Sequence, residues 1–218
     1  MGQKVNRREL SAKTPSRIKA SSILAVAKDR FARFGFAKVT MDEIAQDVGL
    51  VKGALYYYFP TKEQIFEAVI REEQDQFIDE IEILVGRAYA AGEKLRRYVE
   101  KRRLYLQRLV SLGQLDYEAW RKLKPNFQDL FQSFERRECL FLQRILEEGR
   151  RSGEFTLADP RRHARLFLRT IKGLRLLDML YGNPVERVSS TLDQELRLFT
   201  SVFLSAIHKD TKRRNNFL

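Results

Sequence analysis

A lysine, a glycine and three tyrosines lie within seven residues, in the stretch KGALYYY at positions 52–58. The ammonium group of Lys52 can pair with a phosphate or donate to the edge of a guanine. Tyrosine hydroxyls donate to phosphate oxygens, and tyrosine rings pack on a sugar or on the methyl group of thymine. Gly53 costs a helix roughly 1 kcal/mol relative to alanine, which indicates a close approach of the backbone to a partner. This chemistry favours contact with a nucleic acid; the alternative is a short aromatic core helix with one exposed lysine.

The residues around this stretch predict a helix-turn-helix. Thr40 and Glu43 have the spacing of a capping box, in which each side chain accepts a hydrogen bond from an amide at the start of a helix. Gly49 is expected to end this helix, because glycine tolerates the left-handed conformation that is common after a helix. A second helix then runs from about Val51 to Tyr58, and Pro60 stops it. In a helix-turn-helix, the second helix enters the major groove of DNA.

Residues from about 23 to 70 resemble the DNA-binding domain of the TetR/AcrR family of bacterial transcriptional regulators. The resemblance rests on one long, ordered pattern: Phe31, Gly35, Phe36, Thr40, Ile44, Ala45, Gly49, Lys52, Gly53, Leu55, Tyr56, Tyr58, Phe59, Pro60, Lys62 and Glu63. Three positions depart from the family's pattern. Val51 stands where a small hydroxyl residue is usual, Tyr57 where histidine is common, and Arg30 where the residue is often apolar.

This resemblance implies an all-α fold. A three-helix helix-turn-helix DNA-binding domain is expected at 15–60, after a flexible basic arm at 1–14. A larger helical domain for effector binding and dimerisation follows at 61–210, and 211–218 form a tail. Seven residues are assigned to DNA binding: Thr40, Lys52, Gly53, Tyr56, Tyr57, Tyr58 and Lys62. Thr40, Tyr58 and Lys62 are expected to secure the DNA backbone, and the other four to face bases or phosphates.

The last two long helices are expected at about 161–180 and 190–208, and both carry broad apolar faces. The resemblance implies that these helices form a four-helix interface in a homodimer. The predicted interface residues are Phe167, Ile171, Leu174, Leu196, Phe199 and Phe203. Two recognition helices related by a two-fold axis read a palindrome whose half-sites lie about 34 Å, or a multiple of that distance, apart. The alternative is a monomer in which both helices belong to the core.

Aromatic side chains are frequent in the middle helices, where the resemblance implies a pocket for a small, largely apolar effector. The predicted pocket residues are Tyr98, Tyr105, Tyr117, Trp120, Phe127 and Phe131, each with plain core packing as the alternative. Arg102, Arg103 and Arg169 could meet an acidic effector or simply form a solvated face. A run of basic residues without an acid, from Arg161 to Arg175, could bind an anion or pair with acids across a dimer. The identity of the effector stays open.

The charge balance supports a polyanionic partner. The 218 residues include 41 Lys and Arg against 29 Asp and Glu, a formal net charge of +12. Residues 1–60 hold 11 of these basic residues and 5 acidic ones, so half of the net charge lies in the part expected to bind DNA. We therefore expect contacts with DNA phosphates to contribute strongly to the binding free energy, and this contribution to be sensitive to salt. The basic arm either lies along the minor groove or the phosphates, or is a solvated tail.

Other classes of protein have little support. The chain has two histidines and one cysteine, far apart, and it lacks HExxH, ExxH, glycine-rich phosphate-loop and dinucleotide signatures. We therefore predict no catalytic residues, no metal and no cofactor. A single cysteine, Cys139, allows no intramolecular disulfide and fits a reducing cytoplasm. The charged N-terminus lacks the apolar core of a signal peptide, and no apolar run approaches the roughly 20 residues that span a membrane. We expect a cytoplasmic protein without a membrane partner.

The favoured function is a ligand-responsive transcriptional regulator. It is expected to be a repressor that binds double-stranded operator DNA as a dimer and is released by an effector. The alternative is a sequence-specific regulator without a small-molecule effector, either an activator or a factor controlled by another protein. A solid interior, or a pocket too small for a ligand, would favour that alternative.

Overall fold

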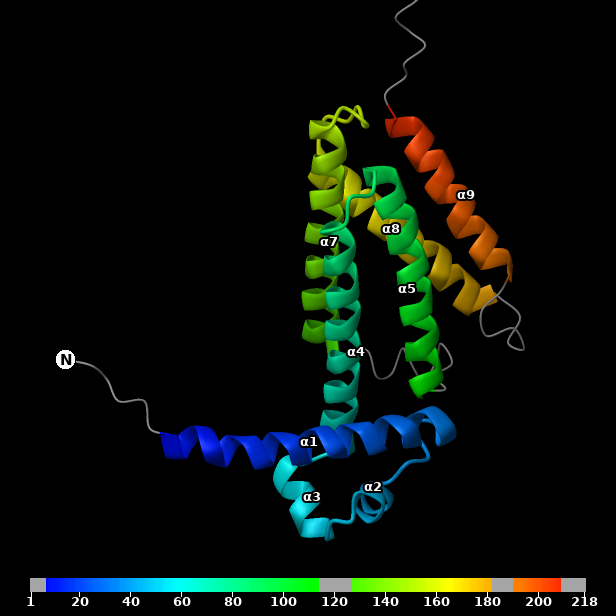
Figure 1. The fold of residues 1–218 in the computed structure, drawn as a ribbon. Helices are drawn as coiled ribbons and strands as arrows, with labels where there is room; N and C mark the ends of the chain where they lie inside the picture. Colours follow the sequence, from blue (N-terminus) through cyan, green and yellow to red (C-terminus); the bar gives the residue numbers. More distant parts are fainter. Residues whose placement is uncertain (1–6, 114–126, 182–189, 209–218) are drawn as a thin grey trace, which may run out of the picture. The chain divides into compact units, whose positions relative to one another are not determined.

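The computed structural model describes residues 7–113, 127–181 and 190–208. Over these residues the fold is all-α, as predicted, and it holds no β-strand. Figure 1 shows the helices in chain order. Their bounds are α1 Arg7–Phe34, α2 Met41–Val48, α3 Lys52–Tyr58, α4 Lys62–Val85, α5 Ala91–Gly113, α7 Gln128–Arg151, α8 Pro160–Tyr181 and α9 Ser190–Ile207. None of the described helices is long and apolar enough to cross a membrane.

The chain divides into two compact units, which we describe separately. The first unit comprises residues 1–73 and 108–115, and the second comprises 74–107 and 116–218. Helices α1, α2 and α3 and the beginning of α4 thus belong to the first unit. The rest of α4, most of α5, and α7, α8 and α9 belong to the second.

The first unit packs around a cluster of three phenylalanine rings. Phe31 of α1 and Phe66 of α4 meet edge to face with ring centroids 5.2 Å apart, and Phe36 lies 4.7 Å from Phe66 and 5.7 Å from Phe31. Aliphatic side chains from all four helices complete this core: Ile23, Leu24, Ala27, Val39, Ile44, Ala45, Leu55, Ile65, Val69 and Ile70. The short helices α2 and α3 are held by this burial, because isolated helices of their length are unstable in water.

Helix α1 begins at Arg7, whereas the sequence predicted a flexible arm at 1–14 and a helical domain only from Pro15, which follows Thr14 as a helix-starting pair. Residues 7–14, which we predicted as part of a flexible arm, are therefore helical. A Ser/Thr-Pro pair is a common start of a helix, but the proline removes only its own amide donor. The residues before it include Arg, Glu, Leu, Ala and Lys, all good helix formers, which explains how the helix extends towards the N-terminus.

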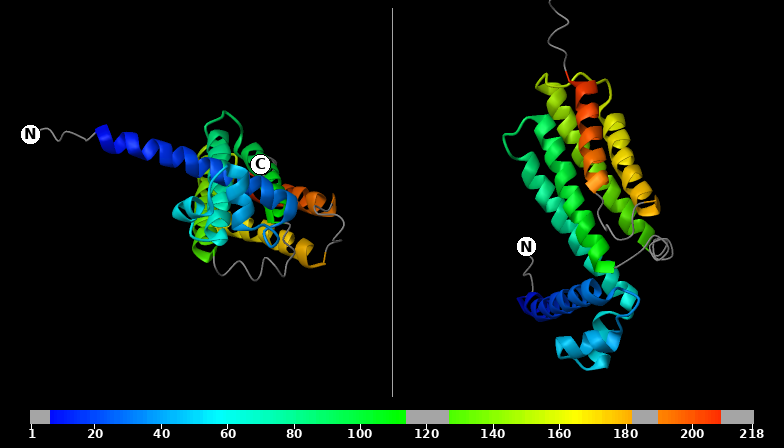
Figure 2. Two further views of the ribbon diagram at one scale, coloured as in Figure 1. Left: turned by 90° about the horizontal axis from the view of Figure 1, so that it is seen from below. Right: turned by 90° about the vertical axis from the view of Figure 1, so that its right-hand side faces the viewer.

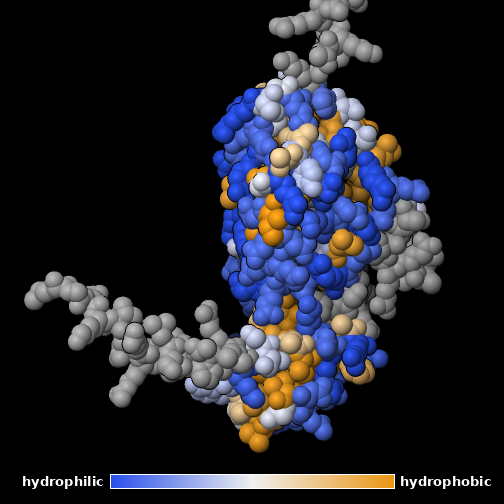
Figure 3. All heavy atoms as spheres, viewed as in Figure 1, coloured by the Kyte–Doolittle hydropathy of each residue, from blue (hydrophilic) through white to orange (hydrophobic). Residues whose placement is uncertain are grey.

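The second unit is a helical bundle, seen from two further directions in Figure 2. Helix α8 packs against both α7 and α9. The core contains large apolar side chains from every helix of the unit: Phe77, Ile81, Leu95, Phe134, Phe141, Leu142, Ile145, Leu146, Phe167, Leu168, Leu196 and Phe203. The carboxylate of Glu154 accepts hydrogen bonds from the amides of Ala91 (2.7 Å) and Gly92 (2.9 Å), which caps the start of α5. In the view of Figure 3 the surface of this unit is mostly hydrophilic, with separate apolar groups.

Candidate nucleic-acid interface

The capping box predicted at the start of α2 is present. The Glu43 amide donates to Thr40 Oγ1 (3.3 Å), and the Thr40 amide donates to Glu43 Oε2 (2.8 Å). At the other end, Gly49 takes the left-handed conformation (φ 70°, ψ 37°), and the Leu50 amide donates to the carbonyl of Ala45 (2.8 Å). Both ends of α2 are therefore fixed by local signals.

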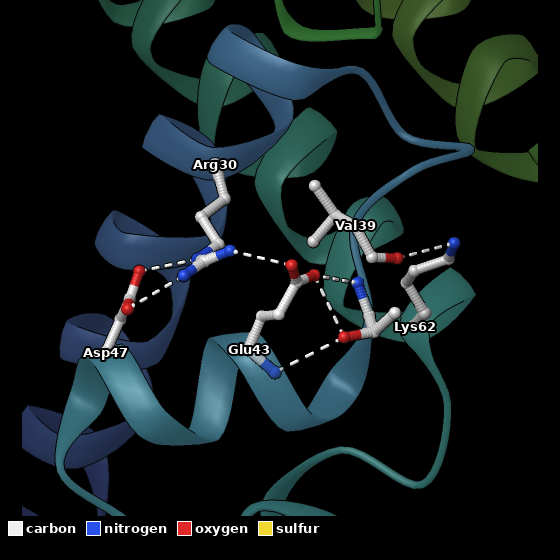
Figure 4. Close-up of polar contacts among 6 residues, drawn as sticks. Arg30, Val39, Glu43, Asp47 and Lys62 are labelled. Atoms are coloured by element: carbon white, nitrogen blue, oxygen red, sulfur yellow. Dashed lines mark hydrogen bonds and ion pairs between the residues drawn. The ribbon is translucent and has the colours of Figure 1, made fainter.

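Arg30 joins α1 to α2 through two carboxylates (Figure 4). Its Nε and Nη2 donate to the two oxygens of Asp47 at 2.5 and 2.9 Å, and its Nη1 lies 3.2 Å from Glu43 Oε1. The hydrogen bonds from Arg30 lower the pKa of Asp47 below its ordinary value. The pKa of Glu43 is lowered chiefly by the backbone amide of Thr40. A two-oxygen guanidinium–carboxylate pair fixes direction as well as distance, so Arg30 sets the orientation of α2 on α1. The sequence identified Arg30 only as a departure from the family.

Lys62 has a different environment from the one predicted. Its Nζ donates to the carbonyl of Val39 at 2.8 Å (Figure 4). It also donates to the carbonyl of Phe36 at 2.8 Å and lies 3.4 Å from the carbonyl of Ala37. The ammonium group also lies 4.5 Å from the ring centroid of Phe36. Lys62 thus ties down the loop between α1 and α2, which leads into the Thr40 cap.

We expect Lys62→Met to lower the free energy of unfolding by about 1–3 kcal/mol, because partly buried carbonyls lose a charged donor. Urea denaturation measures this change. The same variant distinguishes the loop contact from a phosphate contact through the salt dependence of DNA binding. A lysine on a phosphate contributes about one unit to the slope of log affinity against log salt. The slope should stay unchanged in Lys62→Met; a slope reduced by about one would restore the predicted phosphate contact.

Helix α3 is anchored by one buried residue and exposes four others, Lys52, Gly53, Tyr56 and Tyr57. Leu55 is fully buried, whereas Tyr57 is 83% exposed and Tyr56 is 40% exposed. A Cβ atom at Gly53 would meet no other group within 4 Å, so the backbone is open to a partner there. Lys52 is exposed on the same short helix. Tyr58 is half-buried, and its ring meets that of Tyr57 edge to face at 5.5 Å.

The ammonium group of Lys52 is held by Asp42, in the first turn of α2. The Nζ of Lys52 lies 2.9 Å and 3.0 Å from the two carboxylate oxygens of Asp42, and this hydrogen bond raises the pKa of Lys52. Nζ also lies 6.0 Å from the ring centroid of Tyr56. The pair is exposed, so it is weak and can exchange for a phosphate. Val51 precedes α3 without a side-chain cap, as its apolar side chain requires.

The residues predicted for the effector pocket and the dimer interface are mostly buried in the core of the single chain. Tyr98, Tyr105 and Phe127 are buried and Phe131 is half-buried, while Tyr117 and Trp120 fall outside the described residues. Of the predicted dimer residues, Leu174 and Phe199 are half-buried, and the rest pack in the core: Phe167, Ile171, Leu196 and Phe203. Among the side chains that the structure describes on α8 and α9, the exposed large apolar residues are Leu166, Leu176, Leu177, Leu198 and Val202.

The basic run on α8 does not act as one surface. Lys172 donates to Glu135 of α7 (2.5 Å), and Arg175 is buried, whereas Arg161, Arg165 and Arg169 are exposed. Elsewhere in the part of the chain that the structure describes, no group of three or more His, Cys, Asp or Glu side chains is placed to hold a metal ion.

Comparisons with known proteins agree with the helix-turn-helix and with the helical fold. Residues 23–69 fit the family model described as bacterial regulatory proteins, tetR family. A crystal structure of a transcriptional regulator from Cytophaga hutchinsonii is 33% identical, with a TM-score of 0.78, over 86% of this chain and 97% of that one. The uncharacterized HTH-type transcriptional regulator YfiR of Bacillus subtilis is 25% identical over 198 residues, which are 87% of this chain and 93% of YfiR.

A third relative has been solved with a small molecule bound. SmeT is the repressor of the Stenotrophomonas maltophilia multidrug efflux pump SmeDEF, and its complex with triclosan aligns over 89% of this chain and 93% of SmeT. The identity is 23% and the TM-score is 0.65, so the likeness is one of fold.

Proposed function

The chain belongs to the TetR/AcrR family of transcriptional regulators, and on this premise we propose that it is a repressor that binds a palindromic operator as a dimer. The observation that carries the proposal is the exposed face of α3, with Lys52, Gly53, Tyr56 and Tyr57 outward and Leu55 buried behind them. This face offers one cation, two hydroxyls and an open stretch of backbone. Such groups contact phosphates and base edges when a short helix lies in the major groove.

Thr40 has a fixed place in this interface. Its hydroxyl both accepts from the Glu43 amide and lies 2.9 Å from Glu43 Oε2, so the first turn of α2 is rigid. The amides in that turn provide a local site for a phosphate. Asp42 stands in the same turn and draws Lys52 towards α2. On binding, a phosphate would replace Asp42 as the partner of Lys52.

A dimer through α8 and α9 is supported by the apolar side chains that these helices expose. One side of α8 carries Leu166, Gly173 and Leu177, because these residues are separated by seven and four positions. A Cβ at Gly173 would meet nothing within 4 Å, which leaves room for close approach of another helix. Leu198 and Val202 form the matching pair on α9, 66% and 59% exposed. Two copies of these helices would bury both surfaces in a four-helix interface.

We also propose that binding of a small molecule releases this repressor from its operator. The triclosan complex of SmeT shows a ligand on the same fold. An effector shifts operator affinity only by its preference for the DNA-free arrangement, typically by about 1–3 kcal/mol. The second unit has a small cavity of about 20 Å³, space for about one water molecule. Its size favours the second candidate function, a regulator that responds to no small molecule, unless side chains move to admit one.

The test of DNA binding uses the purified full-length chain and a fragment from upstream of its own gene, with fluorescence anisotropy at several salt concentrations. Lys52→Ala and Tyr57→Ala should each weaken operator binding by about tenfold or more, since each removes a contact worth about 1–3 kcal/mol. The matched control is Lys172→Ala, a lysine paired with an acid in the second unit. Binding that is equal on any DNA, or that survives both α3 substitutions, would contradict the proposal.

A further inference from the structure

An apolar side chain is exposed in the turn between α2 and α3. Val51 immediately precedes α3 and is 77% exposed, although valine is one of the residue types most often buried. It adjoins Lys52 and Gly53, which are exposed at the beginning of α3. A single exposed apolar residue is ordinary on a protein surface, so exposure alone assigns no role to Val51.

Val51 occupies the position whose side chain normally caps a helix. Its backbone is extended (φ −71°, ψ 148°), as in other capping residues, but its side chain makes no capping hydrogen bond. Serine, threonine, asparagine and aspartate provide an oxygen to the free amides of the first turn, and valine provides none. Helix α2 has such a cap, because Thr40 accepts from the Glu43 amide. Valine therefore makes α3 less stable, and packing offsets little of this loss because the side chain is exposed. Departures of this kind from a local rule are expected at functional sites.

Hydrogen bonds fix the backbone on both sides of Val51. The Leu50 amide donates to the carbonyl of Ala45 in α2 at 2.8 Å. The Val51 carbonyl accepts from the amides of Ala54 (2.9 Å) and Leu55 (3.3 Å) in α3. Valine is branched at Cβ, so its side chain has few rotamers. The two methyl groups are thus held in place, and they lose little conformational freedom when a partner contacts them.

The partner of these methyl groups must itself be apolar, because the side chain of valine neither donates nor accepts hydrogen bonds. In the major groove of DNA, the apolar group that the bases present is the C5 methyl of thymine. Residues at the beginning of a recognition helix are the ones that contact base edges in helix-turn-helix proteins. The neighbouring side chains also suit DNA, since Lys52 is a cation and Tyr57, 83% exposed, carries a hydroxyl.

We propose that Val51 contacts the C5 methyl group of a thymine in each half-site of the operator and so determines part of the sequence specificity. The inference rests on the proposed function, because it names a base that the same face of the protein recognises. Lys52 contacts a phosphate or a guanine, and Val51 adds an apolar contact that distinguishes thymine from the other three bases. A serine at position 51 would strengthen the beginning of α3 but would lose this contact.

Deoxyuridine in place of thymine tests the contact, because it removes the methyl group and keeps every base-pairing group. An operator with all thymines replaced should bind the parent protein about tenfold more weakly in fluorescence anisotropy. Burial of one methyl group accounts for about fourfold in each half-site, and a dimer occupies two half-sites. Equal affinity for the two operators, with binding that is still selective, would leave Val51 for a protein partner and overturn its role in DNA recognition, while the proposed function stands. Absence of selective binding to either operator would refute the DNA-binding function and this inference with it.

Three substitutions at position 51 assign the thymine preference to this side chain. Val51→Ser and Val51→Ala remove the two γ-methyl groups, so their affinities for the thymine and deoxyuridine operators should lie within about threefold of each other. Val51→Ile keeps an apolar side chain and should retain the preference of about tenfold. Val51→Ser should also raise the melting temperature by about 2–4 °C, because it supplies the missing cap of α3, whereas Val51→Ala should not. All three variants should fold, because Val51 is exposed.

Lys52→Ala is the matched control, since it removes a charge beside Val51 and no methyl group. It should weaken binding to both operators equally and reduce the dependence of affinity on salt, while the thymine preference persists. The three Val51 variants should leave the salt dependence unchanged. A thymine preference that persists in Val51→Ser would assign the methyl contact to another residue and overturn the proposal. Equal weakening of Val51→Ser on both operators would also overturn it, because the contact that was lost would not be with the methyl group.

Discussion

A Leu198→Asp, Val202→Asp variant should be a monomer and should bind the operator about 100-fold more weakly than the parent protein. Both side chains are largely exposed within a single copy, at 66% and 59%, so the charges cost the fold of that copy little. In the proposed four-helix interface the same carboxylates would be buried next to their symmetry mates. The desolvation cost and the like-charge repulsion would then prevent association. A monomer loses the second half-site, and with it an avidity gain of about 100-fold to 10,000-fold.

Sedimentation equilibrium gives the mass of the variant, and anisotropy with operator DNA gives its affinity. The matched control is Leu140→Asp, since Leu140 is 62% exposed but lies on α7. The control should remain dimeric and should keep its affinity for the operator. A dimeric double variant would place the interface elsewhere. A monomeric variant with unchanged affinity for the operator would show that DNA binding does not depend on the dimer.

The contrast between these residues and the ones predicted shows a limit of sequence periodicity. The apolar spacing on α8 selected Phe167 and Ile171, which the structure buries at 0% and 2% exposure. Periodicity identifies the most apolar side of a helix, and this side is the one that is buried in the core of the single chain. Leu166 was not selected because an exposed leucine looks the same in a sequence whether or not a partner covers it. Separating the two requires the packed structure.

Local signals were enough to predict the helix-turn-helix. Thr40, Glu43 and Gly49 act within one helix and its turns, so their residue types and spacing define the ends of α2. The contacts that orient the helices join residues far apart in the chain. Arg30 and Asp47 are 17 residues apart, and Lys62 reaches back 26 residues to the carbonyl of Phe36. Backbone carbonyls leave no trace in a sequence, so the contacts of Lys62 with the loop between α1 and α2 could not be predicted, and its assignment to DNA stays a prediction.

The largest effect on stability is expected at Glu138, the centre of a buried polar cluster. Its Oε1 accepts hydrogen bonds from the hydroxyl of Tyr98 (2.7 Å) and from Nε of Arg102 (2.8 Å), and all three residues are buried. Burial, together with the charge of Glu138, raises the pKa of Tyr98 well above its ordinary value, so the tyrosine remains a donor. Burial alone would lower the pKa of Arg102, but the adjacent carboxylate more than offsets this, and the pKa is raised.

Glu138→Leu should lower the free energy of unfolding by about 3–5 kcal/mol, because it leaves the Arg102 cation buried without its carboxylate. Adding Arg102→Met to the same chain should recover most of that loss, since an apolar pair of similar volume replaces a charge pair whose attraction is largely offset by desolvation. Urea denaturation of the two single variants and the double variant gives the coupling energy directly. Losses that simply add would show that Glu138 and Arg102 act independently. A matched control is Glu100→Leu, which removes an exposed partner of Arg103 and should cost less than about 1 kcal/mol.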